Sequence, residues 1–354
     1  MIAWIVIAIV VVLPPASFAH EAGDLYRQAL TATQSQQFSE AQGLLKRALE
    51  QFPSYPEAHH LLGLVQFELT HDPASAIPHL QQAIELAPHF VQAHYDLALL
   101  YLHQQKMDAA QPLLEQALQD YPNFWEAVLV LAQLFEKHGR LSPALAQYER
   151  VLAQQPDQSE ALYAVGYLHF KNGEWDKARP PLSRLVAAHP QHGDGWLLLG
   201  RVEELHNQPD QAIQDYETAV RLQPENDEAH HSLGFLYRQQ GKIPKAIEHF
   251  QAVTRLKPDD HEAFMNLGVL LVSTNEFEKG KEAYLQALRL HEPSPELHYN
   301  LGNFFEFHEV DLERAQHHYR RYVELGGTDP RVQHLLEQLS QTSSSKSQSS
   351  GESN

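Results

Sequence analysis

The sequence contains no cysteine in 354 residues. This absence excludes disulfides, thiol catalysis, iron–sulfur clusters and zinc sites built on cysteine ligands. The phosphate-binding pattern G-x-x-x-x-G-K-[ST], the nucleophile pattern G-x-S-x-G, the metalloprotease pattern H-E-x-x-H and the dinucleotide pattern G-x-G-x-x-G are all missing too. We therefore expect no enzymatic activity, no catalytic residue and no cofactor.

Positive charge is also scarce. The chain carries 26 basic and 45 acidic residues, which gives a net charge of −19. Such a chain repels nucleic acid and anionic lipid, so neither is expected as a partner. Part of the acidity recurs near the start of predicted helices, where a carboxylate is favourable to the helix dipole, and we interpret it as structural. The column is Glu57, Glu126, Glu160, Asp194, Glu228, Glu262 and Glu296.

What the chain does have is a period. Prolines recur at intervals of 34 residues, at Pro88, Pro122, Pro156, Pro190, Pro224 and Pro258. A period of this length is typical of a repeat array. A column of small residues keeps the same interval after a first step of 35 residues, and a column of bulky residues follows a second small column by four places. The first is Gly63, Ala98, Ala132, Gly166, Gly200, Gly234, Gly268 and Gly302, and the bulky one is Leu45, Leu80, Leu114, Tyr148, Leu182, Tyr216, Phe250, Tyr284 and Tyr319.

Each unit predicts two helices. In residues 227–258, apolar side chains are spaced by three and four in both halves, which is the amphipathic helical pattern. Gly241 separates the halves and Pro258 ends the second, as expected of residues that terminate helices. Where two helices cross, the small column lets the backbones approach while the bulky column fills the space beside them.

These units resemble the tetratricopeptide repeat (TPR) family. Residues 193–224 carry its pattern in Trp196, Leu199, Gly200, Ala212, Tyr216, Ala219 and Pro224. The resemblance covers about nine units between Ala22 and Pro330. It implies an all-α fold, a right-handed superhelical solenoid of stacked helix-turn-helix repeats, with a concave groove lined by first helices that binds protein or peptide segments.

On this resemblance, aromatic, basic and mixed polar residues of the first helices are the candidate partner-binding residues. They are Tyr95, Leu99, Tyr163, Tyr167, Phe170, Arg201, His231, Phe235, Arg238, Tyr299 and Asn303. The alternative is that individual members simply pack between repeats. The family's clamp for acidic chain termini needs Lys, Arg and Asn together, and its places here hold residues such as Asp96, Val130 and Leu198, so an acidic C-terminal peptide is not expected.

The two ends differ from the array. Ile2–Leu13 is apolar but shorter than the roughly 20 residues of a membrane-spanning helix, and Ser17-Phe18-Ala19 fits a signal-peptidase site. We predict a signal peptide at 1–19 and an exported, periplasmic protein. The alternative is an uncleaved anchor at residues 2–13. We further predict an array at 20–330, a capping helix at 331–341 and a disordered Ser-rich tail at 342–354.

Histidine is abundant, with 23 residues. No two histidines have the i, i+4 spacing that favours a metal site on one helix, so no metal site is predicted. Protonating all of them would change the formal charge from −19 to −19 + 23 = +4, which suggests a pH effect. The predicted function is a non-catalytic scaffold or adaptor of the cell envelope. A regulatory subunit of an envelope enzyme complex and a histidine-based metal-handling protein are the alternatives.

Overall fold

The computed structural model describes residues 20–338, and every regular element in this range is a helix. The predicted signal segment 1–19 and tail 342–354 lie outside the described residues, as does the end of the predicted capping helix. Among residues 20–338, no helix combines the length and the apolar character needed to cross a membrane.

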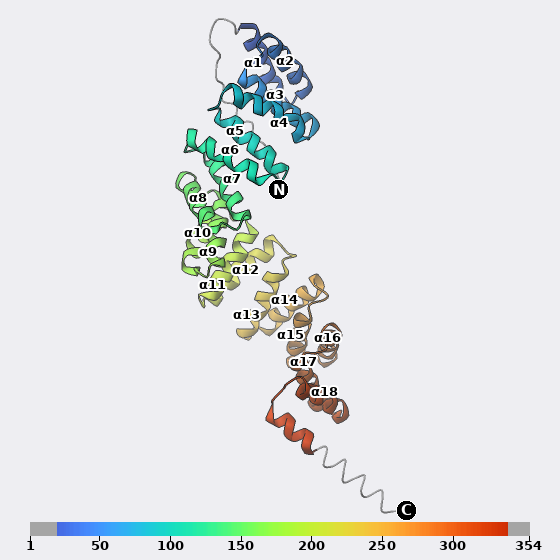
Figure 1. Ribbon diagram of the computed structural model, residues 1–354. Coiled ribbons are helices and arrows are strands. Elements are labelled where there is room, and N and C mark those ends of the chain that lie inside the picture. Colours follow the sequence, from blue (N-terminus) through green and yellow to red (C-terminus); the bar gives the residue numbers. More distant parts are fainter. Residues whose placement is uncertain (1–19, 339–354) are drawn as a thin grey trace, which may run out of the picture. The chain divides into compact units, whose positions relative to one another are not determined.

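The helices follow one another in pairs (Figure 1). The first helices are α1 (His20–Gln34), α3 (Pro56–Thr70), α5 (Val91–His103), α7 (Trp125–Lys137), α9 (Ser159–Lys171), α11 (Gly193–Leu205), α13 (Asp227–Gln239), α15 (His261–Ser273) and α17 (Pro295–Phe304). The second helices are α2 (Phe38–Gln51), α4 (Pro73–Leu86), α6 (Met107–Asp120), α8 (Leu141–Gln154), α10 (Trp175–Ala188), α12 (Pro209–Leu222), α14 (Ile243–Leu256), α16 (Phe277–Leu290) and α18 (Leu312–Glu324).

The chain divides into two compact units, residues 1–184 and 185–354, with the division inside α10. Within each unit a helix packs mainly on the helices before and after it in the sequence. This nearest-neighbour packing is the property that defines a solenoid of repeats. The predicted class, all-α with stacked helix pairs, is confirmed.

The two residue columns seen in the sequence meet inside each pair. A Cβ atom added to Gly200 would lie 2.9 Å from the ring of Tyr216, and one added to Gly268 would lie 2.6 Å from the ring of Tyr284. Both rings are buried. In these two pairs a side chain on the first helix would overlap the tyrosine ring of the second, so the small column makes room for the bulky column as the spacing predicts. In the fourth pair the same two places hold Ala132 and the buried Tyr148.

The turn inside each pair contains one residue with positive φ. The nine residues are Gln36, His71, Gln105, Gly139, Gly173, Asn207, Gly241, Asn275 and Val310, with φ between 51° and 75°. Glycine and asparagine suit this left-handed conformation, whereas a β-branched residue there is strained. Val310 is the β-branched member of the column, and its side chain is 75% exposed.

The ninth pair contains one extra residue between the glycine column and the turn. Gly302 precedes Val310 by eight residues, whereas Gly268 precedes Asn275 by seven. The chain absorbs the additional residue as a π-helix, η1 (Phe305–Glu309), which continues α17. This is the usual way in which a helix accommodates a single insertion without losing its register on both sides.

Residues 330–338 are helical and follow the last pair. The Asp329 carboxylate accepts hydrogen bonds from the backbone N–H groups of Arg331 and Val332, at 2.8 and 3.3 Å, which caps this helix. Val332 is fully buried in the apolar cluster of the ninth pair. The helix thus covers the apolar side of the last pair.

Candidate functional site: the first-helix faces

Every candidate partner-binding residue lies on a first helix, and none of them is fully buried. In unit 1, Tyr95 packs against Phe124 with ring centroids 4.8 Å apart. Burial, followed by the Asp96 and Glu126 carboxylates, raises the pKa of the Tyr95 phenol. Tyr163 and Tyr167 stack with centroids 6.2 Å apart and planes 9° from parallel. Leu99 and Phe170 are half-buried.

In unit 2, the α13 candidates form one cluster. His231 and Phe235 contact each other edge to face at 4.8 Å, and Phe235 also contacts Phe250 at 5.3 Å. The Arg238 guanidinium lies 5.8 Å from the Phe235 ring and donates to the Asn266 side-chain oxygen at 2.7 Å. This combination of half-buried aromatic rings and an exposed arginine is typical of binding surfaces.

The candidates of the ninth pair already have partners within the chain. The Tyr299 hydroxyl donates to Asp329 at 3.0 Å. The Asn303 side-chain oxygen accepts from the Tyr319 hydroxyl at 2.8 Å and from Arg331 at 2.5 Å. Because Asp329 and Arg331 begin the helix at 330–338, this terminal helix occupies the polar groups of Tyr299 and Asn303. The candidates therefore form separate local groups on successive first helices.

A tyrosine–glutamate bond recurs on these faces. The Tyr148 hydroxyl donates to Glu136 at 2.6 Å, Tyr216 donates to Glu204 at 2.9 Å, and Tyr319 donates to Glu306 at 2.5 Å. Each glutamate lies four residues after the small-column residue of its first helix, which is Ala132, Gly200 or Gly302. Burial raises the pKa of all three phenols, so each remains a hydrogen-bond donor at neutral pH. The sequence analysis did not find these pairs.

The bulky column contains a fourth tyrosine, Tyr284, which lacks a glutamate on the facing helix. Tyr284 faces the first-helix place that holds Val272, which has no acceptor, and burial alone raises its pKa. In the remaining pairs the bulky residue is Leu or Phe, and the corresponding first-helix place holds no glutamate. A glutamate thus accompanies a tyrosine, and comparing the two columns repeat by repeat would have detected the bonds.

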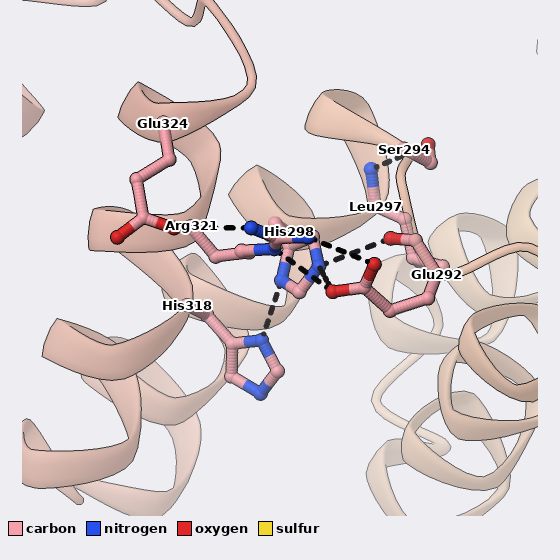
Figure 2. Close-up of polar contacts among 7 residues, drawn as sticks. All are labelled: Glu292, Ser294, Leu297, His298, His318, Arg321 and Glu324. Atoms are coloured by element: carbon pink, nitrogen blue, oxygen red, sulfur yellow. Dashed lines mark hydrogen bonds and ion pairs between the residues drawn. The ribbon is translucent and has the colours of Figure 1, made fainter.

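Histidines also pair across the two helices of a repeat. In the ninth pair, His298 Nδ1 lies 2.9 Å from His318 Nδ1, and His298 Nε2 lies 3.2 Å from the backbone oxygen of Glu292 (Figure 2). The Arg321 guanidinium bonds both carboxylate oxygens of Glu292, at 2.8 and 3.0 Å. Both imidazoles are buried.

The same geometry occurs twice more. His230 Nδ1 lies 2.9 Å from His249 Nδ1, with Nε2 facing the backbone oxygen of Pro224. His59 and His79 are joined in the same way at 3.5 Å, with His59 Nε2 facing the backbone oxygen of Pro53. Since Nε2 must donate to the carbonyl, Nδ1 of the first-helix histidine accepts and the second-helix histidine donates.

Burial keeps these pairs neutral. Burial, followed by the charge of the partner imidazole, lowers the pKa of His249 and that of His318 to about 4. The pKa values of His79, His230 and His298 are also lowered by burial. Within residues 20–338, no group of three or more His, Cys, Asp or Glu side chains is placed to hold a metal ion. The paired imidazoles are accordingly hydrogen-bonding partners that join the two helices.

Both units are thus arrays of helix pairs that present half-buried aromatic and charged residues on their first helices, which defines an all-α repeat protein. The family model of the tetratricopeptide repeat matches residues 26–69, 70–123, 104–159, 129–192, 163–227, 197–261, 231–279 and 265–330. The chain belongs to the tetratricopeptide repeat family, as its sequence pattern predicts.

Solved TPR structures share this fold. The C-terminal part of a TPR protein from Cytophaga hutchinsonii is 15% identical, with 68% of this chain and 99% of that one covered and a TM-score of 0.57. PilF of Pseudomonas aeruginosa is 21% identical, with coverages of 60% and 96% and a TM-score of 0.52. YrrB, described as a TPR protein with an unusual peptide-binding site, is 25% identical, with coverages of 52% and 94% and a TM-score of 0.47. No curated protein matches the chain.

Proposed function

We propose that this protein is a non-catalytic scaffold that binds segments of partner proteins on its first-helix faces. Membership of the TPR family supports a role in protein–protein interaction. The observation that carries the proposal is the recurrence of half-buried aromatic rings on first helices, joined by an exposed arginine in the group of His231, Phe235 and Arg238. Such residues supply most of the binding energy at protein interfaces.

We also propose that the protein acts in the cell envelope after export. The support is the apolar segment at residues 2–13 and the small-x-small pattern that ends at Ala19. Mass determination of the protein purified from its own cells tests this point. A chain that begins at His20 is expected, and a chain that still begins at Met1 contradicts cleavage and favours the anchored alternative.

Site-specific crosslinking tests the binding faces. A photoreactive amino acid is placed singly at Leu99, Tyr167 or Phe235, and at Glu149 or Gln251 as controls exposed on second helices. After irradiation in cells, the first-helix positions are expected to give crosslinks to a common partner, identified by mass spectrometry. Purified partner should then bind the Phe235→Ala variant about tenfold more weakly than the unmodified protein.

Two results would contradict the proposal. One is crosslinking from Glu149 and Gln251 but not from the first-helix positions, which places the interface on second helices. The other is unchanged affinity of the purified partner for the variants at Leu99, Tyr167 and Phe235 together.

A further inference from the structure

The tyrosine–glutamate bond recurs in the fourth, sixth and ninth pairs, and an arginine accompanies it in two of them. In the ninth pair, Arg331 donates from one nitrogen to Glu306 at 2.8 Å and from the other to Asn303 at 2.5 Å and Tyr319 at 2.9 Å. Its guanidinium also lies 5.3 Å from the centre of the Phe307 ring. These groups form a complete guanidinium-binding site, and the chain fills it with its own arginine.

The sixth pair contains its cation in a different place. Arg201 takes the position that Asn303 has in the ninth pair, and it forms an ion pair of 2.9 Å with Glu228. Its charge acts on Tyr216, whose hydroxyl donates to Glu204. Arg201 thus pairs with Glu228 and lies close to the Tyr216 hydroxyl that bonds Glu204.

The fourth pair has the same acceptors without the arginine. Gln133 replaces Asn303, Glu136 replaces Glu306 and Tyr148 replaces Tyr319. Where Arg331 begins the terminal helix, the following first helix here supplies Glu160, and the Gln133 side-chain nitrogen donates to it at 3.3 Å. Between residues 20 and 338, nothing forms an ion pair with Glu136 or Glu160. We call Gln133, Glu136, Tyr148 and Glu160 the Glu136 site.

The surface beside these residues is open. A hollow of about 460 Å³ is lined by Gln133, Glu136 and Lys137 on α7. Glu136 on this hollow and the neighbouring exposed Glu160, neither of which is in an ion pair between residues 20 and 338, favour a cation. The acceptors that a single planar guanidinium satisfies in the ninth pair select arginine over lysine, because only arginine presents a fork of donors.

We propose that the Glu136 site binds an arginine side chain of a partner protein. The inference rests on the proposed scaffold function and specifies the chemistry of one contact in it. Glu136 and the oxygen of Gln133 accept from the guanidinium as Glu306 and Asn303 accept from Arg331, while Glu160 adds a second negative charge. Lys137 lies on the same hollow where the ninth pair has Phe307, so it weakens binding by its like charge.

Titration of the full chain with a capped Ala-Ala-Arg-Ala-Ala peptide, followed by NMR, tests the site without any knowledge of the partner. The side-chain amide of Gln133 serves as the local reporter. We expect its signal to shift saturably with the arginine peptide, at least about fivefold more weakly with the lysine peptide, and not with the peptide that contains neutral citrulline.

Substitutions in the fourth pair and in the sixth pair extend the test. Glu136→Gln keeps the acceptor for Tyr148 but removes the charge, and it is expected to weaken peptide binding about tenfold. Arg201→Gln gives the sixth pair the residue set of the fourth, so the amide of the new glutamine should respond to the peptide as Gln133 does. Glu149→Gln on the exposed side of α8 is the matched control and should leave binding unchanged.

The proposal is overturned if Gln133 does not respond saturably, if Glu136→Gln and Glu149→Gln behave alike, or if the citrulline peptide binds as well as the arginine peptide. Equal binding of lysine and arginine overturns the guanidinium specificity. These results are independent of the crosslinking experiment. Crosslinks without a peptide response support the scaffold function and contradict the Glu136 site. A peptide response without crosslinks supports the Glu136 site and contradicts the scaffold function.

Discussion

Nδ1 of His318 donates a hydrogen bond to Nδ1 of His298 across 2.9 Å between the two helices of the ninth pair. In this orientation the bond requires a neutral His298, since a proton on His298 Nδ1 would face the N–H of His318. The charged groups around the pair are Glu292, Arg321 and His317. Burial outweighs the attraction of Glu292 for a proton on His298, so the pKa of His298 is lowered. Burial, followed by His298 and His317, lowers the pKa of His318.

Acid should therefore destabilise this pair of helices. The pKa of His318 is about 4 in the folded state and about 6.5 when unfolded, so the unfolded chain binds protons first as the pH falls. Stability is complete above pH 6.5 and is lost between 6.5 and 4, on the order of 2–3 kcal/mol for this imidazole. Amide hydrogen exchange of α17 and α18 at pH 7.5, 6 and 5 measures the loss.

A substitution taken from the eighth pair provides the control. Phe264 and Ala283 stand there at the places of His298 and His318, so the double variant His298→Phe/His318→Ala carries no titrating ring at either place. Its opening free energy, obtained after dividing each exchange rate by the intrinsic rate at that pH, should stay nearly constant over this pH range. An equally steep pH dependence in the double variant would assign the effect to other groups.

Two helical glycines, one in the small column and one outside it, should change the free energy of unfolding in opposite directions when replaced by alanine. Gly200→Ala places a methyl group 2.9 Å from the fully buried Tyr216 ring, which has no room to retreat. We expect a loss of about 1–3 kcal/mol of unfolding free energy. Gly43→Ala, at an exposed place in α2 with no atom within 4 Å, should instead gain about 0.5–1 kcal/mol from better helix propensity.

Chemical denaturation of the two variants compares them directly. If both alanines stabilise the protein, the close approach of α11 and α12 is less tight than the contact of Gly200 with Tyr216 requires. If both destabilise it, the argument from helix propensity at Gly43 is wrong.

The period of the sequence was sufficient to predict the helix pairs, their turns and the contact between the small and bulky columns. Gly200 and Tyr216 show why: repeats stack on identical neighbours, so a residue type that recurs at one interval reports one recurring contact. The candidate faces were located as well, because a helical position fixes the direction of a side chain. Whether these faces bind partners stays a prediction.

The paired side chains were not predicted, for a physical reason. His298 and His318 are 20 residues apart, and each is one polar residue in a column that elsewhere holds Trp196 or Phe264. Neither column alone therefore predicts a histidine pair. Only two columns compared within the same repeat reveal that each second-helix histidine, His79, His249 or His318, stands opposite a first-helix histidine, and only coordinates show that their nitrogens meet.

Arg331 holds the terminal helix against the ninth pair. Arg331→Ala removes its bonds to Glu306, Asn303 and Tyr319, and because the arginine is partly exposed we expect a loss of only about 1–2 kcal/mol. The amides of residues 331–338 should exchange faster, while those of α13 and α14 remain unchanged. Gln333→Ala, an exposed change on the same helix, is the control and should leave exchange as it is.

Val310 stores strain in the last turn of the array. Its φ of 56° puts a β-branched residue in the left-handed region, where an L-residue costs roughly 1–2 kcal/mol. Its side chain is 75% exposed, so little apolar burial is lost on replacement. Asparagine occupies the equivalent places Asn207 and Asn275, and Val310→Asn should therefore stabilise α17 and α18 by about 1 kcal/mol.

The reverse substitution completes the argument. Asn275→Val introduces the same strain into a regular turn, without a π-helix before it, and should destabilise α15 and α16 by a similar amount. Hydrogen exchange of both helix pairs in the two variants provides the comparison. If Asn275→Val is destabilising while Val310→Asn has no effect, the strain at Val310 is already relieved in the native turn, where the π-helix at Phe305–Glu309 directly precedes it.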